Sequence, residues 1–319
     1  MPVDVRGLRC FLAVVAAGSV SRAAQLLHLA QPALSLQIRH LEETLGVTLF
    51  NRSHKGVTPT AAGLRLENHA REILKRLDIA CEDVRDQTAN PEGRVAIGLP
   101  QSMAKILVVP LVREALRRWP RVRLQIIELS TGYIPNHVLS GHLDMGLTFQ
   151  ARTGSGLLFE HMGDEELVLV AQPGRLGAGG QPRRTVRLRG LRRYPMILPA
   201  REHSLRTLID GHMRTHGVEL AVLAEVNAIS ELIALAAAGV GCSILSYAAI
   251  QAELRHGSLS AARITHPAMS RPVYLCRSAS LPQSTAASVV QGLLTEILGV
   301  QIANACSAMP CILDSAAKL

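Results

Sequence analysis

Three helix signals follow one another within the first 46 residues, and no other feature restricts the fold as strongly. Residues 5–15 carry apolar side chains at helical spacing, and Gly18 ends that pattern. Ser19 is a favourable N-cap for a second, short helix. After a brief turn a third helix is predicted over 31–45, with proline at an early position and Gly46 at its end. Because helices this short need one another to bury their apolar sides, a small helical domain is predicted.

The predicted third helix has two chemically different sides. Its apolar side is spaced by four, three and four positions and is expected to face inward: Leu34, Ile38, Leu41 and Leu45. The opposite side presents Pro32, Leu36, Arg39 and His40, flanked by Ser35 and Gln37. Glutamine can read adenine, arginine can read guanine, and an apolar group can pack on the thymine methyl. Two helices joined by a tight turn, the second with such a face, predict a helix-turn-helix that reads DNA.

The segment after the third helix predicts a β-hairpin. Residues 47–60 form two short extended stretches around a turn at Lys55-Gly56. Such a wing would place Arg52 and Lys55 against phosphates, which position a DNA-binding domain without reading sequence. Each arginine taken alone is more often an ordinary solvated side chain. Together the helices and the hairpin are specific, and residues 1–60 are therefore predicted to be a winged helix-turn-helix domain.

A long helix is predicted to follow, capped by Thr60 and running to about Thr88. Over this linker (61–89) the apolar residues alternate spacings of four and three and form a narrow heptad seam, which indicates pairing between two chains. A helix packed on its own domain is the competing interpretation, and it would normally show a wider apolar stripe. The residues predicted to mediate dimerisation are Leu66, Ala70, Ile73, Leu77, Ala80 and Val84.

Beyond a hinge at 90–93 the pattern changes to alternating strands and helices. This order is typical of an α/β domain with a mostly parallel sheet. The pattern repeats in a second half, so the domain over 94–302 is predicted to have two lobes. Lobe I is expected at about 94–162 and 268–302, and lobe II at about 163–267. The tail, residues 303–319, shows no clear pattern and is expected to be frayed.

Composition and charge narrow the class of protein. The formal net charge is +9, but residues 1–60 contribute only six basic and three acidic side chains. Residues 175–206 hold nine arginines and one acid, a run that is more often a solvated face than a second nucleic-acid surface. The apolar stretches are interrupted by charges and are too short to cross a bilayer, so no membrane association is expected. The chain is expected to be cytoplasmic.

The sequence lacks the common motifs of metal-binding sites, cofactor-binding sites and catalytic sites. The six cysteines form no C-x-x-C pair, and no histidine cluster has zinc-ligand spacing, so neither a metal nor a cofactor is expected. There is no G-x-S-x-G elbow, P-loop or G-x-G-x-x-G after a strand, so an enzyme is not expected. A solute-binding protein of the transport type would fit the C-terminal region alone. That alternative requires export, and the DNA-binding pattern of the first sixty residues argues against it.

The sequence resembles the LysR-type transcriptional regulators. The resemblance is specific over residues 19–28 and 31–46 and at Leu49, Phe50, Arg52, Gly56, Thr60 and Gly63, and it is looser at 93–98, 141–146 and 239–241. It implies a multidomain α+β and α/β chain: a winged helix-turn-helix, a dimerising linker helix and a two-lobed effector domain similar to periplasmic binding proteins. It also implies a homodimer or a homotetramer built from two kinds of subunit, and RNA polymerase is a candidate partner.

The resemblance also implies which residues contact double-stranded promoter DNA. The matching positions are Gln31, Pro32, Ser35, Leu36, Arg39 and, in the wing, Arg52. Two positions depart from the family pattern. Ala30 stands where a hydroxyl is usual, and the lost cap or phosphate contact is worth about 1 kcal/mol. Leu36 stands where the family often has a polar or basic residue, so a contact to a thymine methyl is expected there in place of a hydrogen bond.

The resemblance places an effector between the two lobes. Helix N-termini at the carboxyl ends of strands suit a small anion such as a carboxylate. The predicted effector-binding residues are Gln101, Ser102, Ser130, Thr131, Thr148, His203, Ser204 and Asn227. Serine and threonine before a helix are more often simple caps, and that interpretation stays open for each position. A regulator that needs no ligand, and is controlled by its abundance or by a partner, also stays open.

Overall fold

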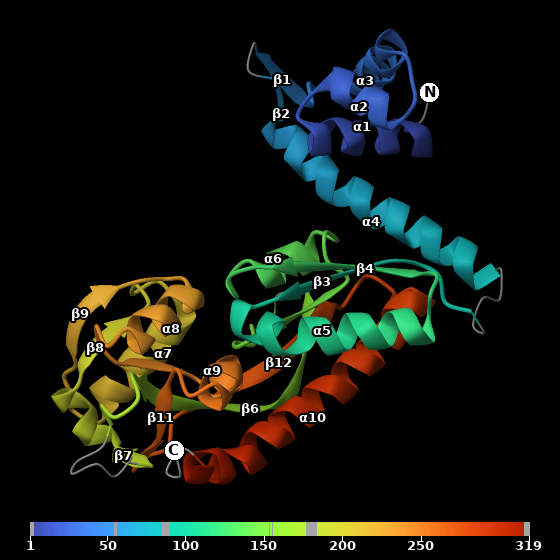
Figure 1. Cartoon of the computed structure of the whole chain (residues 1–319). Coiled ribbons are helices and arrows are strands. Elements are labelled where there is room, and N and C mark those ends of the chain that lie inside the picture. Colours follow the sequence, from blue (N-terminus) through green and yellow to red (C-terminus); the bar gives the residue numbers. More distant parts are fainter. Residues whose placement is uncertain are drawn as a thin grey trace.

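In the computed structural model, which describes residues 3–53, 56–84, 90–152, 154, 156–176 and 184–315, the chain has three parts (Figure 1). A small head lies at one end of a long helix, α4 (Ala61–Val84). A larger domain has two lobes, one beneath α4 and the other to the left of it in this view. The head and the two-lobed domain are therefore separate bodies that α4 connects.

The head contains the elements that the sequence predicts. Each predicted helix end carries its expected signal, since Gly18 and Gly46 end α1 and α3 in the left-handed conformation and the Ser19 hydroxyl accepts from the Arg22 N–H. Ala30 provides no side-chain cap to α3. The hairpin pairs Arg52 with Val57, so the predicted wing is confirmed. The elements are α1 (Val5–Ala17), α2 (Val20–Leu26), α3 (Gln31–Leu45), β1 (Phe50–Ser53) and β2 (Gly56–Pro59).

The core of the head joins α3 to the other helices and to α4. Leu34, Ile38 and Leu41 are buried, as the spacing predicts, whereas Leu45 is 38% exposed. Leu45 was expected to face inward, and that prediction is wrong because the last turn of α3 extends past the core. The Phe11 and Phe50 rings lie 5.1 Å apart and connect α1 to the wing. Burial of side chains of this size supplies the main stabilisation of so small a domain.

The first turns of α4 belong to the core of the head. The Thr60 hydroxyl caps the helix by accepting from the Gly63 N–H at 3.0 Å, as predicted. Ala70 is fully buried and Leu66 half-buried against that core, and Leu74 packs there as well. The prediction that Ala70 faces a second chain is therefore corrected, because its side chain is fully used by the head. Leu66 contacts the head with part of its side chain, and the later residues of the seam are exposed.

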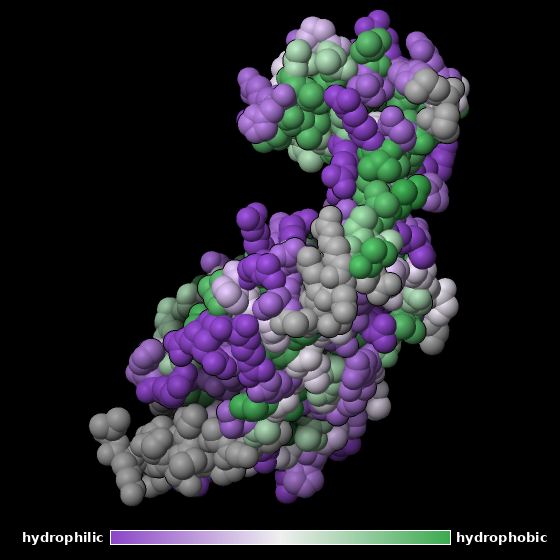
Figure 2. Space-filling view, turned by 90° about the vertical axis from the view of Figure 1, so that its right-hand side faces the viewer, coloured by the Kyte–Doolittle hydropathy of each residue, from purple (hydrophilic) through white to green (hydrophobic). Residues whose placement is uncertain are grey.

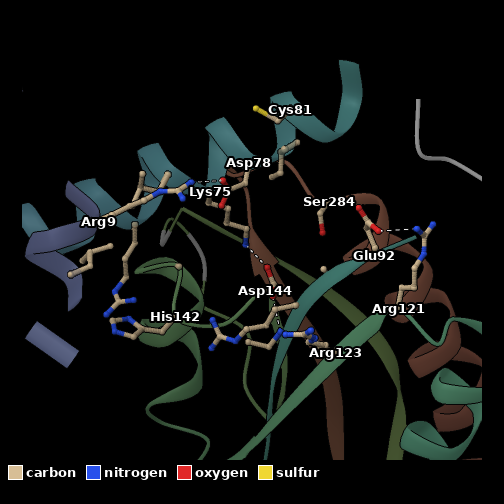
Figure 3. Close-up of a pocket in the computed structure, with 18 of the residues that line it drawn as sticks. Arg9, Lys75, Asp78, Cys81, Glu92, Arg121, Arg123, His142, Asp144 and Ser284 are labelled. Carbon is tan, nitrogen blue, oxygen red and sulfur yellow. Dashed lines mark hydrogen bonds and ion pairs between the residues drawn. The ribbon is translucent and has the colours of Figure 1, made fainter. Parts of the chain in front are cut away.

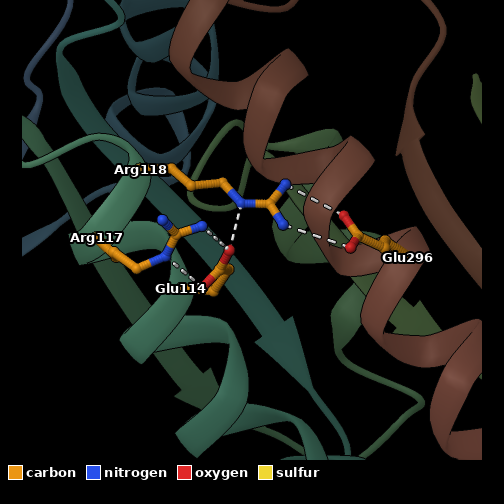
Figure 4. A network of polar contacts seen from close by, with 4 residues as sticks. All are labelled: Glu114, Arg117, Arg118 and Glu296. Atoms are coloured by element: carbon orange, nitrogen blue, oxygen red, sulfur yellow. Dashed lines mark hydrogen bonds and ion pairs between the residues drawn. The ribbon is translucent and has the colours of Figure 1, made fainter.

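Lobe I is built around strands β3, β5 and β12, with α5 and α10 packed together. Arg118 of α5 donates to Glu114 of the same helix at 2.5 Å and to Glu296 of α10 at 3.2 Å, which ties the two helices together (Figure 4). Hydrogen bonds from Arg117 and Arg118 lower the pKa of Glu114 to about 2. The lobe comprises β3 (Gly93–Leu99), α5 (Gln101–Arg118), β4 (Val122–Glu128), α6 (Ile134–Leu139), β5 (Met145–Thr148), β12 (Ser270–Ser278), α10 (Thr285–Ser315) and the first part of β6 (Leu157–Ala171).

Lobe II has its own core, formed by buried residues between Leu167 and Met269. Its strands β8 and β9 form a separate parallel pair, which α7 and α8 adjoin. The lobe comprises the second part of β6, β7 (Thr185–Arg187), the 3-10 helix η2 (Leu188–Arg193), β8 (Pro195–Leu198), α7 (Ser204–Thr215), β9 (Ala221–Glu225), α8 (Ile229–Ala237), β10 (Ser243–Ser246), η3 (Ala248–Ile250), α9 (Gln251–Arg255) and β11 (Ser260–Thr265).

The long strand β6 runs through both lobes. It pairs with β12 in lobe I and with β10 and β11 in lobe II, and all these pairings are antiparallel. The eight-stranded sheet follows the order β4-β3-β5-β12-β6-β11-β7, with β10 also paired to β6. The prediction of a mostly parallel sheet is therefore wrong for the central strands. It holds for the flanking pairs, such as β3 with β4, because only those are linked by crossover helices.

The C-terminal helix α10 is longer than the sequence pattern predicts. It is helical to Ser315, whereas the sequence shows no clear pattern from 303 onwards. Residues Thr285–Asn304 are also long and apolar enough to cross a bilayer. Val290, Leu294 and Leu298 are buried in lobe I, which identifies α10 as a core helix.

Candidate nucleic-acid interface and interlobe cavity

The outer face of α3 is free at the far end of the molecule from the two lobes (Figure 1). Gln31, Pro32 and Arg39 are exposed, Ser35 is half-buried, and Leu36 is 60% exposed. Leu36 therefore takes no part in packing the core of the head, although the opposite side of α3 is well buried. The face can enter a major groove with an amide, a guanidinium and an apolar side chain.

The wing is attached to α3 through hydrogen bonds from its backbone N–H groups. Glu42 of α3 accepts from the N–H groups of Leu49 and Phe50, at 2.7 and 3.3 Å. Arg52 is exposed on β1, in position for a phosphate. The predicted wing residue Lys55 lies outside the described residues. The carboxylate of Glu42 thus fixes the spacing between the reading helix and the wing.

The second half of α4 presents an apolar face to solvent. Ile73 is 49% exposed, Leu77 37% and Val84 86%, and Ala80 is exposed as well. Figure 2 shows apolar side chains gathered along the neck between the head and the lobes. Exposed apolar residues in such a row are typical of a surface that meets another chain.

A cavity of about 230 Å³ lies between the lobes and gathers most of the predicted effector residues. Three helices begin at it: α5, whose N-cap residue Pro100 provides no side-chain cap, α8, whose first N–H donates to the Gln101 side chain, and α7, which His203 caps. Helix N-termini offer free N–H groups and a partial positive charge. The predicted residues that line it are Gln101, Ser102, Ser130, Thr131, His203, Ser204 and Asn227.

One predicted effector residue lies elsewhere. Thr148 is 2% exposed and does not line the cavity, and its hydroxyl lies 3.5 Å from the backbone N–H and O of Gln150. Its assignment to the site is therefore corrected. The end of β5 instead contributes Phe149, the next residue, whose ring faces the cavity. Side chains of a strand alternate between its faces, so a shift of one position decides which residue reaches the site.

Arg271 is the central residue that sequence reasoning missed. It is 3% exposed, donates to Glu165 at 2.7 Å and to Ser102 at 2.9 Å, and its guanidinium stacks 3.5 Å from the centre of the Phe149 ring. The register of β12 with β6 places Arg271 opposite Glu165. Local spacing cannot reveal that pairing, because the two residues are more than a hundred positions apart.

The two lobes contact each other across the cavity. The hydroxyls of Thr131 and Ser204 lie 2.9 Å apart, and the Gln101 side chain accepts from the Ile229 N–H at 2.8 Å. Each bond joins a residue of lobe I to one of lobe II. Burial lowers the pKa of His203, and the positive charge of Arg271 lowers it further, so this ring is neutral at pH 7. The bonds across the cavity must rearrange if the lobes open.

A second, larger cavity of about 1020 Å³ separates α4 from lobe I (Figure 3). Lys75 of α4 reaches Asp144 at 2.6 Å, and Asp144 also accepts from the Ala96 N–H of β3. Glu67 of α4 lies 3.3 Å from His142 of lobe I. These contacts attach the linker helix to lobe I.

These features define a class of protein: a winged helix-turn-helix joined by a long helix to a two-lobed binding domain. Residues 5–64 match the family model of the bacterial regulatory helix-turn-helix protein, lysR family. Residues 88–298 match the LysR substrate binding domain. The chain belongs to the LysR family of DNA-binding transcriptional regulators, and the resemblance seen in the sequence is confirmed.

Curated relatives match nearly the whole chain. The nitrogen assimilation regulatory protein nac of Klebsiella aerogenes is 30% identical over 297 residues, which is 93% of this chain and 95% of that protein. The regulator ClcR of Pseudomonas putida is 31% identical over 245 residues, 76% of this chain and 82% of that protein. The relatives are regulators of transcription.

Solved structures share the fold. Full-length OxyR of Pseudomonas aeruginosa superposes with a TM-score of 0.74 at 19% identity, covering 94% of this chain and 98% of that one. Full-length CbnR, solved in complex with its target DNA, gives a TM-score of 0.65 at 22% identity over 94% of this chain and all of that chain. At these identities the likeness concerns the arrangement of head, linker helix and lobes.

Proposed function

We propose that this regulator reads promoter DNA with Gln31, Pro32, Ser35, Leu36 and Arg39 of α3, and grips phosphates with the wing. The observation that carries the proposal is the exposed face of α3, where Leu36 and Arg39 have no partner among the described residues. In this scheme the protein acts in the cytoplasm, as a binding protein and not as an enzyme. Pairing through the free part of α4 supplies the two-fold symmetry that paired half-sites require.

The DNA proposal is tested with a duplex selected from a random library by the full-length protein. Arg39→Ala should weaken binding of the selected duplex by about 1–3 kcal/mol, or roughly 5- to 150-fold, because a bidentate arginine–guanine contact is lost. Arg214→Ala is the matched control, since Arg214 is exposed on α7, far from the head. Equal affinities and an unchanged base preference for Arg39→Ala would remove Arg39 from the reading set.

We further propose that a small effector with an acidic group binds in the interlobe cavity. The convergence of three helix N-termini and Arg271 supports this, because an anion there meets free N–H groups and a guanidinium. Effector binding would change the contacts between the lobes, shift the population of lobe orientations and thereby move the head through α4. RNA polymerase is the proposed recipient of that change at the promoter.

Thermal unfolding with a panel of small carboxylates, aromatic acids, amino acids and inorganic anions tests the effector proposal. A ligand at 100 times its dissociation constant stabilises the native state by about 2.7 kcal/mol, which raises the midpoint by several degrees. Ser102→Ala should reduce that shift. If every class leaves the midpoint unchanged, the second candidate function, a regulator controlled by abundance or by a protein partner, is favoured instead.

A further inference from the structure

The charged residues that line the interlobe cavity do not favour a simple anion. Its buried cation, Arg271, is already paired with Glu165 at 2.7 Å, so the two charges cancel. His203 is neutral at neutral pH. The remaining charged group of the lining is Glu128, an exposed carboxylate. Among the described residues Glu128 has neither a hydrogen bond nor an ion pair, although it ends β4 beside the first turn of α5.

The same cavity nevertheless offers strong donors. The first turn of α5 has no side-chain cap, and Nη1 of Arg271 makes no hydrogen bond within the described part of the chain. These groups can hold a carboxylate. A simple carboxylate placed there would lie in one small cavity with the unpaired carboxylate of Glu128. Like charges that line one small cavity repel, so a ligand that also carries a cationic group facing Glu128 is favoured.

We propose that the effector is a zwitterion of the α-amino acid type, an inference that rests on the proposed effector site. Its carboxylate meets Arg271 and the start of α5, and its ammonium group meets Glu128. The cavity of about 230 Å³ is smaller than the roughly 300–1,000 Å³ pockets that hold drug-sized ligands. An adjoining cavity of about 210 Å³ shares Phe149, Ser204 and Arg271 and offers Leu205 and Leu208 to a side chain.

Titration calorimetry on the full-length protein tests the inference with the twenty standard amino acids as probes. Each amino acid that binds is then compared with its deaminated acid and its carboxamide. Binding of the amino acid should be at least about tenfold tighter than binding of either derivative, because each lacks one of the two charge-assisted contacts. Glu128→Gln should weaken the amino acid about tenfold or more and should not weaken the deaminated acid, because loss of the Glu128 charge removes a repulsion. Glu160→Gln is the control, since it removes an exposed carboxylate of lobe I outside the cavity.

The outcomes separate this inference from the proposed function. If deaminated acids bind as tightly as amino acids and Glu128→Gln has no effect, the zwitterion is refuted while the effector cavity stands. If none of the twenty amino acids produces heat, the inference is also refuted. The DNA titration with Arg39→Ala decides the regulator's DNA function independently of either result.

Discussion

Gly63→Ala, which adds a single methyl group, should loosen the packing of the wing against the rest of the head. Gly63 lies in the first turn of α4, and a Cβ there would lie 2.2 Å from the carbonyl oxygen of Leu49. That oxygen cannot move aside cheaply, because it accepts from the Thr60 N–H at 2.9 Å. The Thr60 hydroxyl also donates to the Thr48 carbonyl at 2.8 Å. The strand that leads into the wing is therefore the part that must shift.

The expected magnitude follows from two opposing effects. Glycine to alanine inside a helix normally stabilises by about 0.5–1 kcal/mol. Forcing a methyl group into a filled space costs about 1–3 kcal/mol, and here the obstacle is backbone. Gly63→Ala should therefore destabilise the head by about 1–2 kcal/mol. Hydrogen exchange resolved by peptide should show roughly 5- to 30-fold faster exchange across the head, and affinity for the selected duplex should fall.

Gly211 supplies the matched control. It lies inside α7, and a Cβ there would meet nothing within 4 Å. Gly211→Ala should slow exchange in α7 slightly and leave DNA binding unchanged, because only the helix-propensity effect remains. If the two variants change exchange in the same direction by the same amount, the steric reasoning about Gly63 is refuted.

Three further predictions concern the linker and the cavity. Leu77→Glu should shift the protein from dimer towards monomer in analytical ultracentrifugation, because a charge would enter the proposed contact between two α4 helices. An unchanged molecular mass would exclude Leu77 from that contact. Lys75→Met should lower the free energy of unfolding by about 1–2 kcal/mol, because Asp144 loses its ion-pair partner. Urea titrations followed by Trp119 fluorescence measure this change, and an unchanged free energy would show that the ion pair does not stabilise the protein. The lowered pKa of His203 means that the unfolded state binds a proton more readily, so stability falls as pH drops through about 6.5. His203→Gln should reduce that fall between pH 7.5 and 5.5, and an equal fall in both proteins would contradict the cause given.

The head could be predicted from the sequence almost completely. Its helices are short, their ends carry Gly18, Ser19 and Gly46, and their packing depends on neighbours close in the chain. Local signals of this kind specify local structure, because the groups they satisfy lie within a few residues. Leu45 shows where the pattern stops being sufficient, since its exposure depends on what lies opposite the last turn of α3.

The heptad seam of α4 illustrates how one pattern can serve two purposes. The spacing identifies an apolar row but not the surface that each residue meets. In the structure Ala70 contacts the head, whereas Leu77 stays exposed. The division depends on the angle between α4 and the head, which the contacts of Gly63 and Leu74 set. No periodicity within α4 encodes that angle.

The sequence by itself determined the order of the parts, the fold of the head and most of the side chains at the interlobe cavity. Polar residues at strand ends and helix starts could be found because strand polarity brings such positions to one edge. Only the tertiary structure decided the charge of that cavity. Arg271 meets Glu165 through the antiparallel register of β12 and β6, and Glu128 has no partner within the described ranges of the chain. Register joins residues far apart in the chain, so the chemistry that selects an effector emerges only when the strands pair.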